Sequence, residues 1–326
     1  MTSISANEAR QKMNDLAKGN IPFLFVIDFE MQEAFVAAVD NVNSDEIRYD
    51  INGITNFEKT NVEPKHVDFK IYPFSKEKYC EAFKKVQKEI FYGNSFLLNL
   101  TFPSKIETNY TLEDFFGYSK ARYKIWVKDR FVSFSPEIFV QTKENKIFSY
   151  PMKGTIDASL PDAAQKLLLN KKETAEHYTI VDLIRNDLSI VAKDVNVLRF
   201  RYLDTIKTHK NTLLQMSSEI SGTLRKEFIN NPGDLMFNLL PAGSVSGAPK
   251  KKTLEIIRDT EVFKRGFYTG VAGIFNNGNI DSGVLIRYIE KNNDDLFYRS
   301  GGGITGKSNC EEEYQELTQK IYVPFH

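Results

Sequence analysis

The feature that most limits the fold of this chain is a succession of short β-type segments separated only by turns. Such segments cover 123–128, 130–134, 138–142 and 146–150, and they return over 270–275, 280–289 and 296–299. One of the later turns contains Asn277-Gly278, which is a typical hairpin sequence. Because consecutive strands with short connections pair in opposite directions, we predict mostly antiparallel β-sheets.

Helical patterns lie between these segments. Apolar residues recur at helical spacing from Tyr79 to Ile90, with Ser75 before them as a capping residue and Gly93 after them as a stop signal. Further helices are predicted within 161–192 and 311–320. No Pro-, Gly- or Ser-rich linker divides the chain. We therefore interpret 1–326 as one α+β domain, in which 91–326 carries the motifs and 1–90 forms a less defined N-terminal part.

Charge and cysteine content narrow the class of function. Lys plus Arg and Asp plus Glu are equal at 43 each, so nothing favours nucleic acid or an anionic membrane as a partner. Cys80 and Cys310 have no Cys or His neighbours at metal-ligand spacing, and we expect a reducing compartment without a zinc site. The polar segment 1–19 and the short apolar run 23–27 predict no membrane span, so we expect a cytoplasmic protein.

A lysine beside a glycine is the first candidate for chemistry. In Tyr150-Pro151-Met152-Lys153-Gly154-Thr155, Pro151 cannot donate a ladder hydrogen bond, so Lys153 is predicted at the end of a strand. Gly154 allows close approach of a ligand, and the N–H and hydroxyl of Thr155 suit a carboxylate. Lys153 is thus a candidate nucleophile, although most lysines beside loops are solvated surface charges.

Two acidic pairs form the second candidate. Glu173 and Glu176 share one face of a predicted helix, and Glu313 and Glu316 share one face of another. Since Mg²⁺ binds one or two carboxylates together with water and substrate oxygens, the four glutamates form a candidate magnesium site. The alternative is that both pairs lie on ordinary solvated helix faces, where the first pair has lysine neighbours at 171 and 172.

Two glycine-rich segments resemble nucleotide motifs without matching them. The segment 243–250 lacks the spacing of a phosphate-binding loop. The segment 301–306 is a literal GxGxxG, but the chain ends too soon for the βαβ unit that a dinucleotide requires. We therefore predict only a glycine loop whose backbone N–H groups face an anion.

Taken together, the motifs resemble the chorismate-utilising enzyme family. The matching blocks, in family order over about 90–320, are Ser135-Pro136-Glu137, Pro151 to Thr155, Ala175-Glu176-His177 with Ile180 to Asp187, Gly243 to Lys250, Arg265 to Gly270, and Gly301 to Ile304. The resemblance implies two large, mostly antiparallel sheets packed face to face with helices outside.

The residue before Gly-Thr separates members of that family. Anthranilate synthases have alanine there, whereas component I of aminodeoxychorismate synthase has a lysine, as here at Lys153. Leu97 occupies the position of the water-activating lysine of isochorismate synthases, and Gln215 that of a histidine that assists pyruvate loss in anthranilate synthases. The resemblance therefore implies amination of chorismate to 4-amino-4-deoxychorismate, on the route to p-aminobenzoate and folate. Anthranilate synthesis and a non-catalytic chorismate-binding regulatory subunit are the alternatives.

The resemblance also implies roles for particular residues. Lys153 attacks ring C2 and Glu137 is the general acid. Mg²⁺ is held by Glu176 and Glu313, with Glu173 and Glu316 close behind. The remaining substrate contacts are Gly154, Thr155, Gln215, Tyr268, Arg287, Gly302, Gly303 and Lys320. Tyr268 could instead be core packing, Arg287 an interstrand ion pair and Lys320 a helix-terminal charge. Ammonia would come from solution or from a glutamine amidotransferase subunit, because the chain shows no residues for glutamine hydrolysis.

Overall fold

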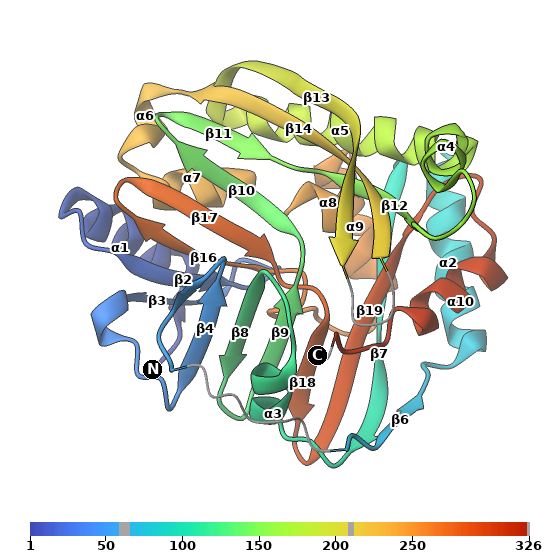
Figure 1. Ribbon diagram of the computed structural model, residues 1–326, viewed down its shortest axis with the longest axis horizontal. Coiled ribbons are helices and arrows are strands. Elements are labelled where there is room, and N and C mark those ends of the chain that lie inside the picture. The colour runs from blue at the N-terminus through green and yellow to red at the C-terminus, as the bar shows by residue number, and fades with distance from the viewer. Residues whose placement is uncertain (59–65, 208–211, 325–326) are drawn as a thin grey trace.

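The computed structural model describes residues 1–58, 66–207 and 212–324 (Figure 1). Within these residues, one sheet has ten strands, and all its pairings are antiparallel. Its order is β1 (Ile4–Ser5), β3 (Glu33–Ala38), β2 (Phe23–Ile27), β16 (Val271–Asn276), β17 (Asn279–Val284), β10 (Ile138–Lys143), β11 (Lys146–Ser149), β14 (Thr212–Leu224) and β12 (Met152–Asp157), with β13 (Ala192–Lys207) also paired to β14.

The second sheet of the described chain has nine strands and is also antiparallel throughout. Its order is β15 (Gly247–Ala248), β7 (Leu97–Thr108), β19 (Asp295–Ile304), β18 (Tyr288–Asn292), β9 (Phe131–Ser135), β8 (Tyr123–Val127), β4 (Ile47–Ile51) and β5 (Ile54–Thr55), with β6 (Phe69–Tyr72) beside β7. Each sheet therefore joins strands from both ends of the chain.

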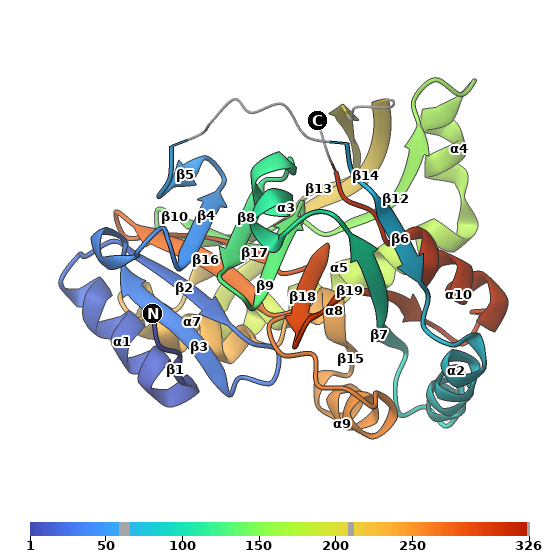
Figure 2. The ribbon, with the colours of Figure 1, turned by 90° about the horizontal axis from the view of Figure 1, so that it is seen from below.

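The two sheets pack face to face through one apolar core. Leu24 and Ile274 of the first sheet meet Tyr49, Ile125 and Phe131 of the second, and all five are buried. Helices cover the outer faces, with α1 and α7 on one side of the molecule and α2 and α10 on the other (Figures 1 and 2). The predicted α+β architecture of two antiparallel sheets with helices outside is confirmed.

The described residues form ten α-helices. They are α1 (Ala6–Lys18), α2 (Lys76–Phe91), α3 (Leu112–Tyr118), α4 (Ala163–Leu169), α5 (Lys171–Val191), α6 (Lys226–Ile229), α7 (Pro232–Leu239), α8 (Gly243–Ser246), α9 (Lys250–Thr260) and α10 (Cys310–Gln319), besides a 3-10 turn at Val39–Asn41. The hydroxyl of Ser75 caps α2 as predicted, by accepting from the N–H of Lys78. Among the described residues, no helix is both long and apolar enough to cross a bilayer.

Lys153 lies inside a strand and not at the end of one. Pro151 separates β11 from β12, yet both strands continue along β14, and the N–H of Ser218 donates to the Pro151 carbonyl. The register of β12 shifts by one residue between Lys153 and Thr155, with Gly154 at φ +76° in the bulge. A bulge of this kind needs glycine, and it turns the lysine toward the second sheet.

The glycines 301–303 also lie in a strand, so the predicted glycine loop is wrong. They belong to β19 and pair with Thr101, Leu100 and Asn99 of β7. On its other side, β19 is paired with β18 only as far as Arg299. Beyond that residue this edge has no ladder partner among the described residues, so backbone groups of β19 at this edge are left for other interactions.

A disulfide joins Cys80 of α2 to Cys310 of α10, with the Cα atoms 5.9 Å apart. The sequence gives no sign of this pairing because 230 residues separate the two cysteines. Because the two cysteines are bonded, cysteine content no longer supports the expectation of a reducing compartment. Since α10 carries Glu313 and Glu316, the bond fixes one of the two acidic helices to its neighbour.

We expect reduction of this disulfide to lower the free energy of unfolding by about 2–4 kcal/mol, because it closes a very long loop in the unfolded chain. The measurement is urea denaturation of the oxidised and the dithiothreitol-treated protein. A variant with both cysteines replaced by serine is the control, and dithiothreitol should leave its midpoint unchanged. Equal midpoints for the oxidised and reduced wild type would contradict the prediction.

Candidate active site

Most of the predicted residues surround one internal cavity of about 460 Å³ between the two sheets. Its walls come from β7, β12, α5, α8, β19 and the end of α10. The cavity is lined by Glu137, Lys153, Gly154, Thr155, Glu173, Glu176, Gln215, Tyr268, Arg287, Gly303, Glu316 and Lys320, whereas Gly302 and Glu313 lie just behind this lining. Segments separated by more than 200 residues therefore meet in one place.

The amine of Lys153 reaches from the first sheet toward the second. Its Nζ lies 3.4 Å from Oε2 of Glu176, and the two side chains are 30% and 16% exposed. A Cβ atom added to Gly303 would lie 3.8 Å from the same Nζ. The lysine is therefore a half-buried group between a carboxylate and a glycine backbone, which differs from the solvated surface lysine of the alternative interpretation.

Glu137 is a partly exposed carboxyl group that lines the same cavity as Lys153. The hydroxyl of Ser244 donates a hydrogen bond of 2.6 Å to Oε1 of Glu137. Burial raises the pKa of Glu137, against the opposing effects of that hydrogen bond and of the positive charges on Lys153, Arg287 and Lys320. A raised pKa keeps the proton on the carboxyl group closer to neutral pH, which suits a general acid.

Two pairs of glutamates lie on the helices beside the cavity. On α5, Oε2 of Glu173 would be 3.0 Å from a Cβ atom added to Gly154. On α10, Oε2 of Glu313 and Oε1 of Glu316 would be 3.5 and 3.8 Å from a Cβ atom added to Gly302. One pair thus faces the bulge of β12, and the other faces the glycine strand of β19.

Basic and polar side chains complete the wall near β19. Lys320 donates to the carbonyl of Gly301 at 3.0 Å and pairs with Glu316 at 2.6 Å. Arg287 donates to the hydroxyl of Tyr322 at 3.0 Å, and its guanidinium lies over that ring. Tyr268 is buried between this wall and Tyr288. Both Lys320 and Arg287 therefore lie near the backbone edge of β19, where a carboxylate ligand would find positive charge.

Sequence reasoning missed several residues of this cavity. Ser244 lies in the motif 243–250, to which no role was assigned, and its hydroxyl donates to Glu137, the predicted acid. Asn99 faces the cavity from β7, and the buried hydroxyl of Ser300 has no hydrogen-bond partner among the described residues. The alternation of β7 places Asn99 on the side of Leu97 and was an available signal, whereas nothing in the sequence singles out Ser300.

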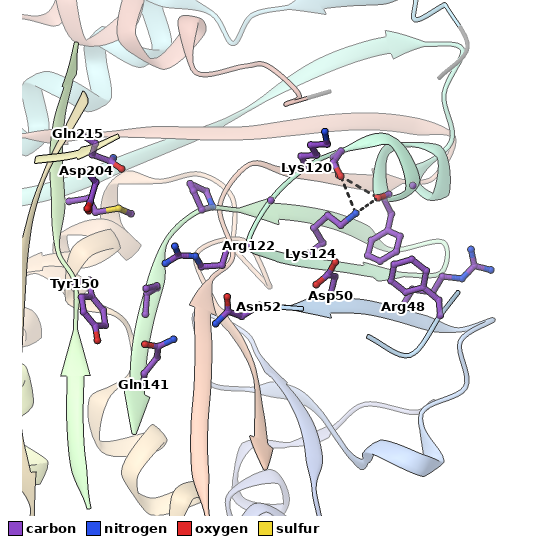
Figure 3. Close-up of a pocket in the computed structure, with 18 of the residues that line it drawn as sticks. Arg48, Asp50, Asn52, Lys120, Arg122, Lys124, Gln141, Tyr150, Asp204 and Gln215 are labelled. Atoms are coloured by element: carbon purple, nitrogen blue, oxygen red, sulfur yellow. Dashed lines mark hydrogen bonds between the residues drawn. The ribbon is translucent and has the colours of Figure 1, made fainter. Parts of the chain in front are cut away.

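A larger open cleft of about 1730 Å³ lies beside the cavity (Figure 3). The wall between them consists of Pro136, Ile138, Tyr150, Met152 and Gln215, which line both spaces. Of the predicted site residues, the cleft contains Gln215 alone. Figure 3 shows Gln215 and Asp204 at one end of the cleft and Arg48 at the other. The predicted catalytic groups therefore belong to the smaller of the two spaces.

Comparison with known proteins agrees with this arrangement. Residues 2–325 match the family described as chorismate binding enzyme. The chain belongs to the chorismate-binding enzyme family. The resemblance inferred from the sequence motifs is thereby confirmed.

Relatives within the chorismate-binding family carry different names. An uncharacterized PabA-like protein of Haemophilus influenzae is 48% identical over 314 residues, which cover 96% of this chain and 95% of that protein. Anthranilate synthase component 1 of Aquifex aeolicus is 32% identical over 275 residues, or 80% of this chain and 55% of that protein. The structure of MenF, the menaquinone-specific isochorismate synthase of Escherichia coli, has a TM-score of 0.74 at 15% identity and covers 98% of this chain and 82% of that chain. This last likeness concerns the fold.

The carboxylates around the cavity suit a hard cation for which water and substrate supply most of the ligands. The glutamates of α5 and α10 supply carboxylate oxygens, which Mg²⁺ prefers. No three His, Cys, Asp or Glu side chains of the described chain form a ready-made metal cluster. The arrangement therefore fits a magnesium ion with few protein ligands, and it does not fit an all-protein cage.

We expect Glu313→Gln to raise the Mg²⁺ concentration needed for half-maximal chorismate turnover by at least about tenfold, because it removes a negatively charged oxygen donor. Thermal stabilisation by Mg²⁺ should shift in the same way, and this measurement needs no turnover. Glu312→Gln is the matched control, since Glu312 is the exposed neighbour on the same helix. A Mg²⁺ dependence of Glu313→Gln equal to that of the wild type would exclude Glu313 as a ligand.

Proposed function

We propose that this protein aminates chorismate to 4-amino-4-deoxychorismate, the reaction of aminodeoxychorismate synthase component I. The observation that carries the proposal is the position of Lys153, whose amine enters the cavity between Glu176 and Gly303. The family membership limits the substrate class, and Glu137, which lines the same cavity and has a raised pKa, is available as an acid. A nucleophile and an acid that line one cavity suit a displacement on a ring bound there.

In the first step, the uncharged amine of Lys153 forms a bond to C2 of the chorismate ring. The double bond between C1 and C2 moves to C1–C6, and the one between C5 and C6 moves to C4–C5. The bond from C4 to its hydroxyl breaks, and Glu137 gives its proton so that water leaves. Lys320, Arg287 and the backbone edge of β19 would bind the enolpyruvyl carboxylate. Glu176 and Glu313, with Glu173 and Glu316, would hold Mg²⁺, which when bound supplies positive charge to the ring carboxylate.

In the second step, ammonia forms a bond to C4 and both ring double bonds shift back to their original positions. The bond between C2 and the lysine breaks, which returns Lys153 as a free amine. The new ammonium group gives one proton to the carboxylate of Glu137, so the acid is restored and the net reaction exchanges a hydroxyl group for an amino group. Ammonia would be taken from solution or from a glutamine amidotransferase subunit acting as a partner.

Anthranilate synthesis is the second candidate, because relatives named anthranilate synthase component 1 share 32% identity with the chain. That reaction also removes pyruvate and makes the ring aromatic. Gln215 at the position that holds a histidine in anthranilate synthases gives this step less support. Hydration of the ring is also less supported, because the apolar Leu97 lines the cavity where isochorismate synthases have a lysine.

The test is mass spectrometry of the product formed from chorismate, ammonium and Mg²⁺. We expect a product in which an amino group replaces the C4 hydroxyl and the enolpyruvyl group is retained. Anthranilate as the product would overturn the proposal in favour of the second candidate. Binding of chorismate without any consumption at high ammonium, with or without an added amidotransferase, would instead indicate a regulatory subunit.

A further inference from the structure

Arg265 is a fully buried arginine outside the cavity, and all five of its N–H donors are used. It is 1% exposed and stacks on Phe29. Two of its N–H groups bind Glu261 at 2.7 and 2.8 Å. The others donate to the carbonyl of Val245 at 2.7 Å, to the carbonyl of Asn99 and to the hydroxyl of Thr269 at 3.4 Å. The planar fork of arginine matches this set of acceptors.

The acceptors of Arg265 belong to three walls of the cavity. Val245 follows Ser244 in α8, and the hydroxyl of Ser244 binds Glu137. Asn99 faces the cavity from β7, and Thr269 follows Tyr268, which lines another side. Arg265 therefore connects the backbone segments that carry the polar groups of the site, although it does not itself line the cavity.

The energetic cost of this arrangement calls for a reason other than stability. Removing both charges of Arg265 and Glu261 from water carries a large penalty, and apolar side chains of similar volume often stabilise a core as well or better. An apolar pair, however, could not donate to the carbonyls of Val245 and Asn99. Glu261 in turn accepts hydrogen bonds from the N–H and the hydroxyl of Thr101, at 2.9 and 3.0 Å. The guanidinium of Arg265 is therefore held in one orientation.

We propose that Arg265 is a positioning residue, which holds the carbonyl of Val245 so that the hydroxyl of Ser244 stays on Glu137. The inference rests on the proposed function, in which Glu137 gives a proton to the leaving hydroxyl group. When the hydrogen bond from Arg265 to the Val245 carbonyl is removed, we expect α8 to shift. The hydroxyl of Ser244 would then no longer lie 2.6 Å from Glu137. Lys320 and Arg287, the proposed carboxylate contacts, do not interact with Arg265, so chorismate affinity should change little.

The test is a double-mutant cycle of Arg265→Lys with Ser244→Ala, measured as kcat and KM for chorismate. Lysine keeps the charge but cannot form the planar fork. We expect each single variant to lower kcat by about tenfold, with KM within about twofold, because each removes the same charge-assisted positioning contact. If Arg265 acts through Ser244, the double variant should also lose only about tenfold, because the two changes remove one shared interaction.

Arg130→Lys serves as the matched control. Arg130 forms a similar two-point pair with Glu33 and also lies over aromatic rings, those of Phe35 and Phe267. It is absent from the cavity lining, so its replacement should change stability without changing kcat. Losses in kcat that multiply in the Arg265→Lys and Ser244→Ala cycle would overturn the proposal, as would an Arg265→Lys variant that is less stable but equally active.

If Arg265→Lys does not fold, the cycle is run with Glu261→Gln, which keeps the side-chain volume but weakens the anchor of the fork. Failure of both variants to fold would show that the pair serves stability, and this too counts against the proposal. A crystal structure of the folded variant separates this inference from the proposed function, because it needs no turnover. Ser244 should have left Glu137, and an unchanged hydrogen bond would contradict the inference whatever the product is.

Discussion

Replacing Lys153 by alanine is expected to abolish chorismate amination, with a loss in kcat of roughly four orders of magnitude or more, as found when an enzyme loses its nucleophile. The variant keeps the cavity and the four glutamates. Binding of chorismate and Mg²⁺ should therefore survive, since the lysine contributes to bond formation and not to the carboxylate contacts. Rates are measured by chorismate consumption at saturating ammonium, and binding by calorimetry.

Lys146→Ala is the matched control for this loss. Lys146 is an exposed lysine on β11, the strand that precedes β12 in the chain, and its replacement should leave both kcat and KM unchanged. Turnover by Lys153→Ala near the wild-type rate would refute the covalent step. A variant that no longer binds chorismate would instead assign Lys153 to substrate binding.

Glu137→Gln is expected to give the second largest loss, of about 10²–10⁴ in kcat, which is the usual contribution of a positioned general acid. Glutamine keeps the shape of the side chain and can still accept from Ser244, but it has no acidic proton. Chorismate affinity should stay close to that of the wild type. A Glu137→Gln variant with more than a tenth of the wild-type kcat would exclude this residue as the acid.

The pH dependence of the wild type provides a separate check on Glu137. Burial raises the pKa of this carboxyl group above its ordinary value, and only the protonated form can act as the acid. The rate should therefore fall as pH rises through this raised pKa. The remaining activity of Glu137→Gln should lack that decrease, whereas a decrease at the same pH in both proteins would assign it to another group.

Much of the fold could be predicted because its elements have local signals. Ser75 caps α2, and Thr111 caps α3 in the way that its sequence pattern predicts. Asn277-Gly278 forms the turn between β16 and β17. The long strand β13 was not predicted, and its pairing with β14 depends on tertiary contact and is interrupted by three register shifts. The disulfide likewise depends on tertiary contact alone.

The site could be predicted in its residue types but not in its geometry. Lys153 and Glu137 come from motifs, whereas the bulge at Gly154 that directs the lysine depends on pairing with β14. The glycines at 301–303 have the composition of a loop, yet pairing with β7 holds them in a strand. Arg265 belongs to the motif 265–270, but the motif gives it no role, and only the folded chain brings its five acceptor atoms together.

The order in which the walls of the cavity occur along the chain has a consequence for biosynthesis. Helix α10 follows every other wall segment in the sequence, and it contributes Glu313 and Glu316 as well as Cys310. A ribosome needs on the order of ten seconds or more to advance from Lys153 to that helix. During this interval the growing polypeptide contains Lys153 and Glu137 but lacks the wall that α10 supplies. Under the proposed function, we therefore expect a nascent chain that stalls before α10 to be inactive.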